Sequence, residues 1–336
     1  MQAVEIRDEF GIEHLTPVER PDPSPGPGQI VMRVRAVSLN FRDLMTVRGM
    51  YNPRQPLPLV PLSDGAGEVI ATGEGVTRVA VGDRVAGIFA QRWLGGEPSA
   101  EARGSTLGGP HDGMLAEQVL LHEDGVVAIP DHLSFEQAAT LPCAAVTAWN
   151  AVVVQGAVKP GDTVLTLGTG GVSIFALQFA KAAGARVIIT SSSDDKLERA
   201  RQLGADETIN YRTTEDWDAR VQALTGKRGA DQVVEVGGAG TLQRSLAACR
   251  IGGTVTVIGV LSGRSSELDI RAVLMKGIRM QGVFVGPREM FEAMNRAITQ
   301  HRIEPVVDRV FELADIQQAF EHMASAAHFG KIVVRL

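Results

Sequence analysis

The pattern of hydrophobic and polar residues changes near Ser134. Before that point, short segments such as 30–37 and 67–73 carry apolar residues at alternating positions, and clusters of proline and glycine separate them. This pattern is typical of β-strands joined by turns. After that point, segments with helical spacing alternate with short β-branched runs, which predicts a parallel sheet with right-handed helical crossovers.

The second region and the tail are expected to contain the following elements. The predicted helices cover residues 135–151, 174–183, a segment after Ser193, 217–224 and 242–248. The predicted strands cover residues 163–167, 186–190, 207–209, 232–236 and 254–258, with an edge strand at 279–285. The tail offers two helical segments and a strand at 331–336. Because the tail is too short to fold alone, we expect it to rejoin the β-rich first region.

The strand predicted at 163–167 leads into a glycine-rich turn and then a helix. Glycine permits the tight turn and lets backbone N–H groups approach a phosphate, while the helix N-terminus adds unpaired donors and partial positive charge. Ser173 stands where the dinucleotide motif has its third glycine, and a turn that binds nothing is the alternative; the strand that follows at 186–190 favours phosphate binding. The residues expected to hold the pyrophosphate are Gly168, Gly170, Gly171 and Val172.

Composition and charge exclude several classes of protein. The chain has 336 residues, of which 44% are hydrophobic, and a net charge of −6 with no basic run, so a nucleic acid is not an expected partner. Residues 1–15 are too charged for a signal peptide, and no apolar stretch is long enough to cross a membrane. Two cysteines, Cys143 and Cys249, cannot build a disulfide framework. We therefore expect a soluble, cytoplasmic protein.

Several short motifs follow one another in a characteristic order. They are Asn40-Phe41-Arg42-Asp43, the segment 61–69, Val81-Gly82-Asp83-Arg84-Val85, the segment 141–148, the glycine-rich turn, the segment 196–206 and Gly330-Lys331. Together they resemble the medium-chain dehydrogenase/reductase superfamily, and specifically its zinc-free quinone-oxidoreductase-like branch. The resemblance implies an α/β fold in which a Rossmann doubly wound parallel sheet, residues 126–285, is inserted in a GroES-like β-rich catalytic domain, residues 1–125 plus 286–336.

The chain lacks the zinc ligands of the metal-dependent relatives. Where they carry a cysteine and a His-Glu pair, this chain has Asn40 and Ser63-Asp64, and neither an amide nor a serine hydroxyl is a good zinc ligand. Asp43 and Asp64 remain, but two carboxylates make a poor tetrahedral site, and residues 89–111 contain no cysteine for a structural zinc. We therefore expect no metal.

A site without a metal favours conjugate reduction. Hydride addition to a quinone or an α,β-unsaturated carbonyl spreads charge into an enolate, which hydrogen-bond donors can stabilise, whereas a simple carbonyl gains more from a Lewis acid. The resemblance implies the same substrates, so we expect a reductase of a small-molecule electrophile. Two alternatives stay open: a zinc-independent NAD(P)-dependent alcohol dehydrogenase or carbonyl reductase, and a non-catalytic sensor that binds NADPH or a quinone.

Asn40 is the expected catalytic residue. An amide can both donate and accept hydrogen bonds, as a group beside the nicotinamide ribose or the substrate oxygen must. A turn-forming asparagine before Phe41 is the alternative interpretation.

NADP(H) is expected in preference to NAD(H). NAD-specific sites place an acid at the end of the second strand, where this chain has Ser191 and Ser192, whose hydroxyls suit a 2′-phosphate. The resemblance maps Lys196 and Tyr211 onto contacts with the same phosphate. The segment Asp194-Asp195 is the alternative for NAD, although acids after a capping serine also suit the first turn of a helix.

The remaining cofactor contacts are expected at the carboxyl ends of strands, where ligands of open parallel sheets bind. These residues are Gly237, Gly259, Leu261, Phe284 and Val285, to which the resemblance adds Thr147 near the nicotinamide and Lys331 from the tail. For the glycines, ordinary strand-ending turns are the alternative. Family members also pair the edge strand across a two-fold axis, so the resemblance implies a homodimer.

Overall fold

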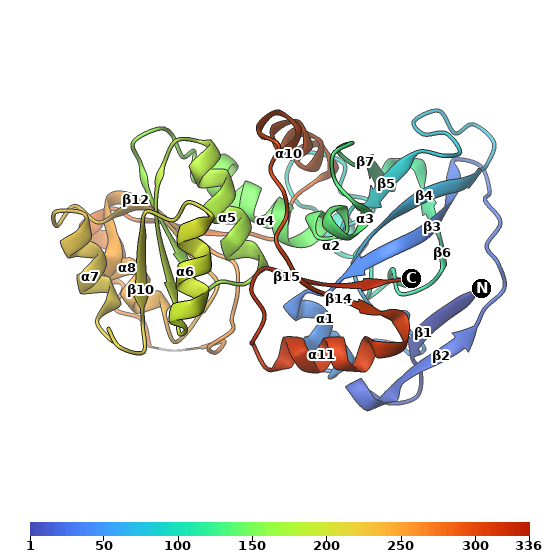
Figure 1. Cartoon of the computed structure of the whole chain (residues 1–336), viewed down its shortest axis with the longest axis horizontal. Coiled ribbons are helices and arrows are strands. Elements are labelled where there is room, and N and C mark those ends of the chain that lie inside the picture. Colours follow the sequence, from blue (N-terminus) through green and yellow to red (C-terminus); the bar gives the residue numbers. More distant parts are fainter. Residues whose placement is uncertain (266) are drawn as a thin grey trace. The chain divides into compact units, whose positions relative to one another are not determined.

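The computed structural model describes residues 1–265 and 267–336. The chain divides into two compact units (Figure 1). Unit 1 combines Met1–Val146 with Gly286–Leu336, and unit 2 is the inserted segment Thr147–Val285.

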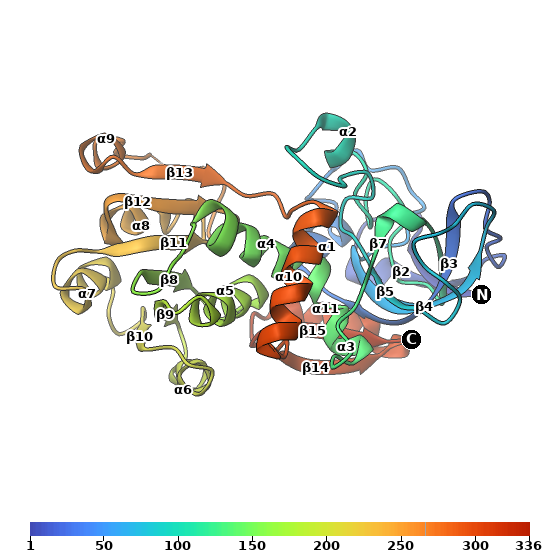
Figure 2. The same cartoon turned by 90° about the horizontal axis from the view of Figure 1, so that it is seen from above.

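Unit 2 contains a six-stranded sheet in the order β10-β9-β8-β11-β12-β13, with every pair of neighbours parallel. The strands are β8 (Thr163–Leu167), β9 (Arg186–Ser191), β10 (Glu207–Asn210), β11 (Ala230–Glu235), β12 (Cys249–Val257) and β13 (Arg279–Gly282). This order is that of a doubly wound dinucleotide-binding sheet, which confirms the predicted Rossmann fold. Figure 2 shows β13 at one edge of the sheet.

The helices of unit 2 connect these strands and cover the sheet. They are α5 (Gly171–Ala182), α6 (Asp194–Gln202), α7 (Trp217–Leu224), α8 (Leu242–Ala248) and α9 (Arg271–Lys276). Helices α5 and α6 lie on one face, and α7 and α8 lie on the other (Figure 1). Strands β8 and β11 are buried along their whole length, because they have helices on both faces.

Unit 1 is built on a seven-stranded sheet in the order β14-β15-β3-β4-β5-β7, with β6 also paired to β3. Its strands are β3 (Gln29–Ser38), β4 (Asp64–Thr72), β5 (Arg84–Gly87), β6 (Gln118–His122), β7 (Val126–Ala128), β14 (Val307–Glu312) and β15 (Lys331–Arg335). A separate antiparallel pair is formed by β1 (Gln2–Ile6) and β2 (Leu15–Glu19). The helices are α1 (Phe41–Val47), α2 (Ala100–Arg103), α3 (Phe135–Ala138), α10 (Arg288–His301) and α11 (Ile316–Ala324).

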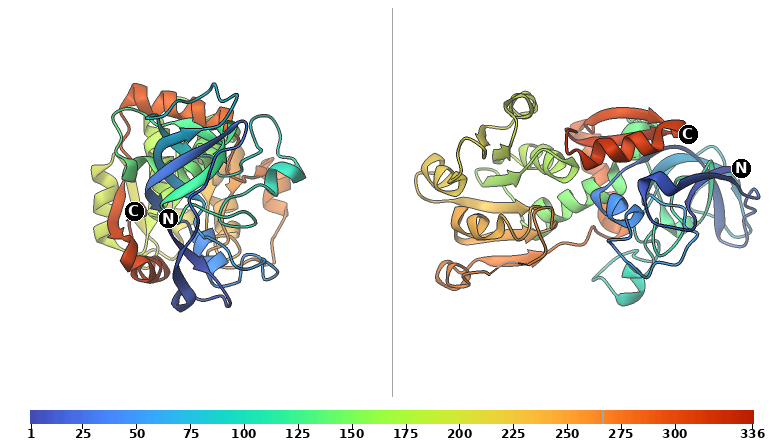
Figure 3. Two further views of the ribbon diagram at one scale, coloured as in Figure 1. Left: turned by 90° about the vertical axis from the view of Figure 1, so that its right-hand side faces the viewer. Right: turned by 90° about the horizontal axis from the view of Figure 1, so that it is seen from below.

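The tail completes the sheet of unit 1, as the sequence predicts. Strand β15, red in Figure 3, pairs antiparallel with β3. In this pairing Val333 lies opposite Ser38. Apolar side chains of the tail, including Phe320 and Ile332, belong to the same buried core as Met32 and Leu44. Burial of these side chains ties the tail to the N-terminal region.

Two expectations about the middle of the chain need correction. The boundary predicted at 125/126 falls inside unit 1, because β7 pairs with β5 and so belongs to the first sheet; the first division lies between Val146 and Thr147. The single helix predicted over 135–151 is instead α3, a π-helical segment Leu141–Ala145, α4 (Val146–Trp149) and a second π-helical segment Asn150–Gln155. Pro142, which has no N–H to donate, lies in the first turn of the π-helical segment that follows α3.

Within the described part of the chain, no helix is both long and apolar enough to cross a membrane.

Candidate functional site

The turn between β8 and α5 in unit 2 leaves room for a phosphate. Gly168 has a φ of +73°, which favours glycine, and a Cβ atom placed on Gly168 or Gly170 would meet no other atom within 4 Å. Gly170 is the N-cap of α5 and offers no side chain to the first N–H groups of the helix. These groups and the helix dipole therefore face open space, an arrangement that fits a pyrophosphate.

Ser173 explains why the missing third glycine does not disturb this turn. Its side chain is buried, and its hydroxyl donates to the carbonyl oxygen of Leu167 at 2.6 Å. The small side chain thus joins the start of α5 to the end of β8. The turn keeps the close helix–strand packing for which the motif uses glycine.

The residues predicted to select the cofactor lie at the adjacent ends of β9 and β10. Ser191 ends β9, its carbonyl oxygen accepts from the Tyr211 N–H at 3.0 Å, and Lys196 lies in the first turn of α6. Asp194 accepts a hydrogen bond from Asn210 Nδ2 at 2.8 Å, and Ser193 caps the helix by accepting from the Lys196 N–H. Asp194 and Ser193 therefore stabilise the start of α6, as in the capping interpretation of this segment.

Two of the predicted glycines have structural roles that sequence reasoning gave only as an alternative. Gly237 donates its N–H to Glu235 Oε1 at 2.7 Å, and its carbonyl oxygen accepts from the Ser262 N–H at 2.7 Å. A Cβ on Gly259 would lie 2.3 Å from the carbonyl oxygen of Val236. The backbone polar groups of Gly237 are thus used within the protein, and Gly259 is needed where two loops cross.

Glu235 is a buried residue that sequence reasoning missed. It ends β11, and its carboxylate accepts hydrogen bonds from the N–H groups of Gly237 and Gly238 and from the hydroxyls of Thr241 and Ser245. The signal available in the sequence was an acid at a strand end, one residue before the glycine pair Gly237-Gly238. Glu235 fixes the loop that follows β11; Leu261, on the loop after β12, is exposed.

Val285, which ends unit 2, has an unusual backbone. Its φ is +44°, a conformation that β-branched residues rarely adopt, and its carbonyl oxygen accepts from Asn150 Nδ2 at 2.6 Å. Asn150 is buried and was not singled out from the sequence. Phe284 precedes this kink, and Thr147 is buried one turn before Asn150. Asn150 therefore stabilises the kink at a predicted cofactor contact.

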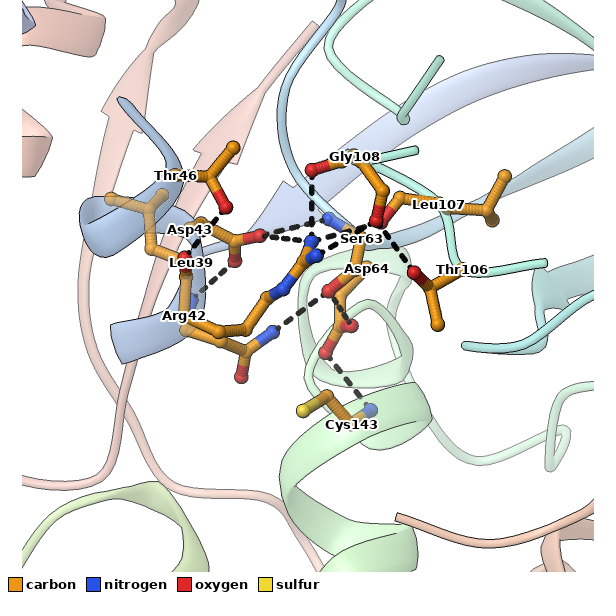
Figure 4. A network of polar contacts seen from close by, with 12 residues as sticks. Leu39, Arg42, Asp43, Thr46, Ser63, Asp64, Thr106, Leu107, Gly108 and Cys143 are labelled. Carbon is orange, nitrogen blue, oxygen red and sulfur yellow. Dashed lines mark hydrogen bonds and ion pairs between the residues drawn. The ribbon is translucent and has the colours of Figure 1, made fainter. Parts of the chain in front are cut away.

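Asn40 lies at the centre of a buried polar network in unit 1. Lys331 Nζ, from the start of β15, donates to Asn40 Oδ1 at 2.5 Å and to the carbonyl oxygen of Leu39 at 2.6 Å. Asn40 Nδ2 donates to Ser63 Oγ at 3.3 Å, and Ser63 Oγ donates to Asp64 Oδ1 at 2.8 Å (Figure 4). The other oxygen of Asp64 accepts from the Cys143 N–H at 3.1 Å.

A second carboxylate, Asp43, fixes the backbone around Asn40. It accepts from the N–H groups of Asn40 at 2.8 Å and Ser63 at 3.2 Å, and it pairs with the Arg42 guanidinium at 3.3 Å. Burial raises the pKa of Asp43 above its usual value, and Arg42 and Lys331 oppose that increase. Burial also raises the pKa of Asp64 to about 6, again opposed by Lys331.

Arg42 connects this network to the loop 107–109 (Figure 4). Its guanidinium donates to the carbonyl oxygens of Leu107, Gly108 and Gly109 at 2.9 to 3.0 Å. It also lies over the rings of Tyr51 and Phe89, at 4.8 and 5.5 Å from their centres. Arg42 therefore joins α1 to the loop 107–109 and holds that loop in place. The sequence pattern did not indicate this contact.

The network does not fit a zinc ion. The one atom of Asn40 that could bind a metal, Oδ1, accepts from the ammonium of Lys331, which would also repel a second cation. Burial raises the pKa of the Cys143 thiol far above its usual value, so the thiolate that zinc requires is disfavoured. Among the residues that the structure describes, no group of three or more His, Cys, Asp and Glu side chains could hold a metal.

Lys331, a predicted cofactor contact, has its partners within unit 1. Its ammonium donates to Asn40 and to the carbonyl oxygen of Leu39. The two partners lie 291 and 292 residues away along the chain, so no local pattern could have revealed them.

Comparison with known proteins identifies the family. Residues 26–131 match the alcohol dehydrogenase GroES-like domain, and residues 171–300 match the zinc-binding dehydrogenase family. The chain is 42% identical to a zinc-type alcohol dehydrogenase-like protein of Schizosaccharomyces pombe, with 98% of each chain covered. It is 27% identical to quinone oxidoreductase-like protein 2 of Bos taurus, over 99% of this chain and 90% of that protein.

A solved structure supports the same assignment. The crystal structure of an NAD-dependent alcohol dehydrogenase superimposes with a TM-score of 0.92 at 36% identity, with all of both chains covered. These matches agree with the glycine turn, the strand order of unit 2 and the sheet of unit 1, and together they establish the family. The chain belongs to the medium-chain dehydrogenase/reductase superfamily and is an NAD(P)-dependent oxidoreductase.

Proposed function

We propose that this protein is an NADPH-dependent, metal-independent reductase that transfers hydride to quinones or α,β-unsaturated carbonyl compounds. The observation that carries the proposal is the ammonium of Lys331, buried 2.5 Å from Asn40 Oδ1 at the position where metal-dependent relatives have a zinc ligand. A protein cation and an amide stand in place of a Lewis acid.

When bound, the reduced nicotinamide supplies the hydride. The task left to the chain is to stabilise the negative charge that develops on the substrate oxygen. Asn40 is 7% exposed, whereas Ser63 and Asp64 are fully buried, so Asn40 is the least buried member of this group of three and the one we assign to the substrate oxygen. Its Nδ2 group carries two hydrogens, and one of them is donated to Ser63.

The strength of this donor favours a delocalised charge. A neutral N–H stabilises an oxyanion less than a divalent cation does. An enolate divides its charge between oxygen and carbon, so it needs less stabilisation than the alkoxide formed from a simple ketone. This difference is why we favour quinones and enones over simple carbonyl compounds.

The end of β9 supports NADPH as the cofactor. Ser191 and Ser192 occupy the place where NAD-specific sites have an acid, and Lys196 and Tyr211 follow on the neighbouring α6 and β10 segments. Asp194 is engaged by Asn210, which supports its role in the helix start. A cationic side chain and hydroxyls match a 2′-phosphate better than a bare ribose hydroxyl.

A second candidate is a metal-independent alcohol dehydrogenase. The names of the relatives favour its alcohol dehydrogenase activity, since the 42% identical protein is called zinc-type alcohol dehydrogenase-like and the superimposed structure is an NAD-dependent alcohol dehydrogenase. Its metal independence rests on the contact between Lys331 and Asn40. A third candidate is a non-catalytic sensor that binds NADPH or a quinone.

One experiment separates these candidates. Purified protein would be assayed for NADPH and NADH oxidation with quinones, enones, enoyl thioesters and aldehydes, and for alcohol oxidation, each with and without a chelator, together with elemental analysis. We expect quinone or enone reduction with NADPH that the chelator does not change. Alcohol oxidation alone, or activity lost together with stoichiometric zinc, would contradict the proposal, and cofactor binding without any turnover would indicate a sensor.

We also propose that the protein is a homodimer. Among the residues that the structure describes, strand β13 pairs with β12 alone, and the preceding α9 segment exposes the apolar residues Ile270, Leu274 and Met275. Pairing of β13 with a second copy would satisfy the edge and cover this apolar surface.

A further inference from the structure

Lys331 joins two parts of unit 1 that are far apart in the sequence. It is the first residue of β15 and is only 3% exposed. Two of the three N–H donors of its ammonium go to Leu39 and Asn40, which immediately precede α1. A buried ammonium is costly unless it is paired, and Asp43 and Asp64 supply the compensating negative charge.

The hydrogen bonds of Lys331 determine which way the Asn40 amide faces. An ammonium can donate but cannot accept, so the amide must present its oxygen to Lys331 and its nitrogen to Ser63. Ser63 in turn accepts from Asn40 and donates to Asp64. The hydrogen bonds in the chain from Lys331 through Asn40 and Ser63 to Asp64 therefore all run in the same direction. If the Asn40 amide were reversed, its NH2 group would face the ammonium of Lys331, and two donors would oppose each other.

The charge of Lys331 also changes the chemistry of the amide. A cation on the carbonyl oxygen draws electron density away from the nitrogen, which makes its hydrogens stronger donors. Bonds arranged head to tail polarise one another in the same sense. Asn40 is less buried than Ser63 and Asp64, so this polarisation acts on the amide of this group that we place beside the substrate oxygen.

We propose that Lys331 is a positioning residue that holds and polarises the Asn40 amide so that its N–H stabilises charge on the substrate, and that it is not a cofactor contact. The inference rests on the proposed function for the identity of the substrate. The orientation of the amide does not depend on that identity, and it can be tested separately.

A double-mutant cycle tests the coupling. Lys331→Met, Asn40→Ala and the double variant would be compared with the wild type for kcat, KM and the Kd for NADPH measured by fluorescence without substrate. We expect K331M to lower kcat about 10- to 100-fold, as loss of an orienting partner does, with the Kd for NADPH within twofold of wild type. The double variant should be no slower than N40A by more than about twofold.

The controls address charge and folding. Lys159→Met removes an exposed lysine of unit 2 and should leave all three constants unchanged. Lys331→Gln keeps a hydrogen-bond donor without the positive charge, so its kcat should lie between the values of the wild type and K331M. If K331M does not fold, K331Q is used in the cycle instead. Additive effects in the cycle, or a tenfold higher Kd for NADPH in K331M, would overturn the proposal.

A measurement without turnover distinguishes this inference from the proposed function. Hydrogen exchange of the Asn40 side-chain amide, followed by NMR, should be at least about tenfold faster in K331M or K331Q than in the wild type. If the protein reduces neither quinones nor enones, the proposed function fails while this result still stands. Equal exchange rates in wild type and both variants would refute the positioning role.

Discussion

The candidate sites of the two units are built in opposite ways. In unit 2, the turn from Gly168 to Gly170 presents backbone N–H groups at a place where side chains are missing. In unit 1, Asn40 is held by a network of side chains that are almost completely buried. The first arrangement suits a phosphate group, which occurs in the cofactors of many enzymes. The second arrangement holds a single side-chain amide in one orientation.

This contrast predicts opposite sensitivities to mutation. Added atoms should harm the glycine turn, because its function depends on open space. Removed atoms should harm the Asn40 network, because each polar group there depends on its neighbour.

The largest effect expected concerns Asp64 in unit 1. Its pKa is raised from 3.8 to about 6 by burial, so the folded protein holds this proton more tightly than the unfolded chain. The resulting stability is fully present below pH 4 and is lost as the pH rises through 6. Asp64→Asn cannot titrate, so the free energy of unfolding of wild type relative to D64N should fall by roughly 3 kcal/mol between pH 3 and 7. Urea unfolding across this range measures it, and a constant difference would argue against a buried, titrating Asp64.

The next effect concerns added volume in unit 2. Gly170→Leu places a side chain where a Cβ meets no neighbour, so the fold should persist while the phosphate position is blocked. We expect the Kd for NADPH to rise about 100-fold, with a smaller rise for Gly170→Ala. Fluorescence titration measures the Kd, and the melting temperature serves as the control. Unchanged affinity in G170L would show that phosphates do not bind at this turn.

A smaller effect is expected at the end of β9. Ser192→Asp supplies the missing acid, and Lys196→Met removes the cation of α6. Together they should shift the preference for NADPH over NADH by about tenfold or more towards NADH, because a carboxylate binds the ribose hydroxyl and repels the 2′-phosphate. The ratio of kcat/KM values for the two cofactors measures the shift, and an unchanged ratio would place the 2′-phosphate elsewhere.

The smallest effect on activity is expected at the surface around α9. Leu274 and Met275 are 78% and 79% exposed, and replacing both with Asp should convert the proposed dimer to a monomer. Because these residues belong to neither recognition site, kcat and the Kd for NADPH should stay within about twofold of wild type. Light scattering determines the mass, and a wild-type protein that is already monomeric would contradict the proposed pairing.

The fold of unit 2 was predictable because its signals are local. Strand–turn–helix order, β-branched runs and the capping residue Ser193 each act within a few residues, and α7 and α8 have the predicted bounds. The boundary at 125/126 failed because β7 is short and its assignment depends on a partner, β5, that lies far earlier in the chain. Local pattern cannot reveal such pairing.

Parts of the candidate site could be singled out where the signal lies in a short motif. The glycine turn and Asn40 were singled out in this way, whereas Glu235 and Asn150 were missed because their roles depend on hydrogen bonds made in the folded structure. Lys331 shows most clearly why local sequence is not sufficient. The sequence singles out this lysine, but its partner Asn40 is 291 residues away, so the contact between them could not be predicted from a local pattern.

The position of β15 in the chain has a consequence for biosynthesis. Residues 1–146 are translated first, yet the sheet that they begin is completed only by a strand translated after all of unit 2. All of unit 2 is therefore translated before the strand that carries Lys331. A nonsense codon shortly before position 331 would leave the segment of unit 2 intact, but it would remove from unit 1 both a sheet strand and the ammonium that contacts Asn40.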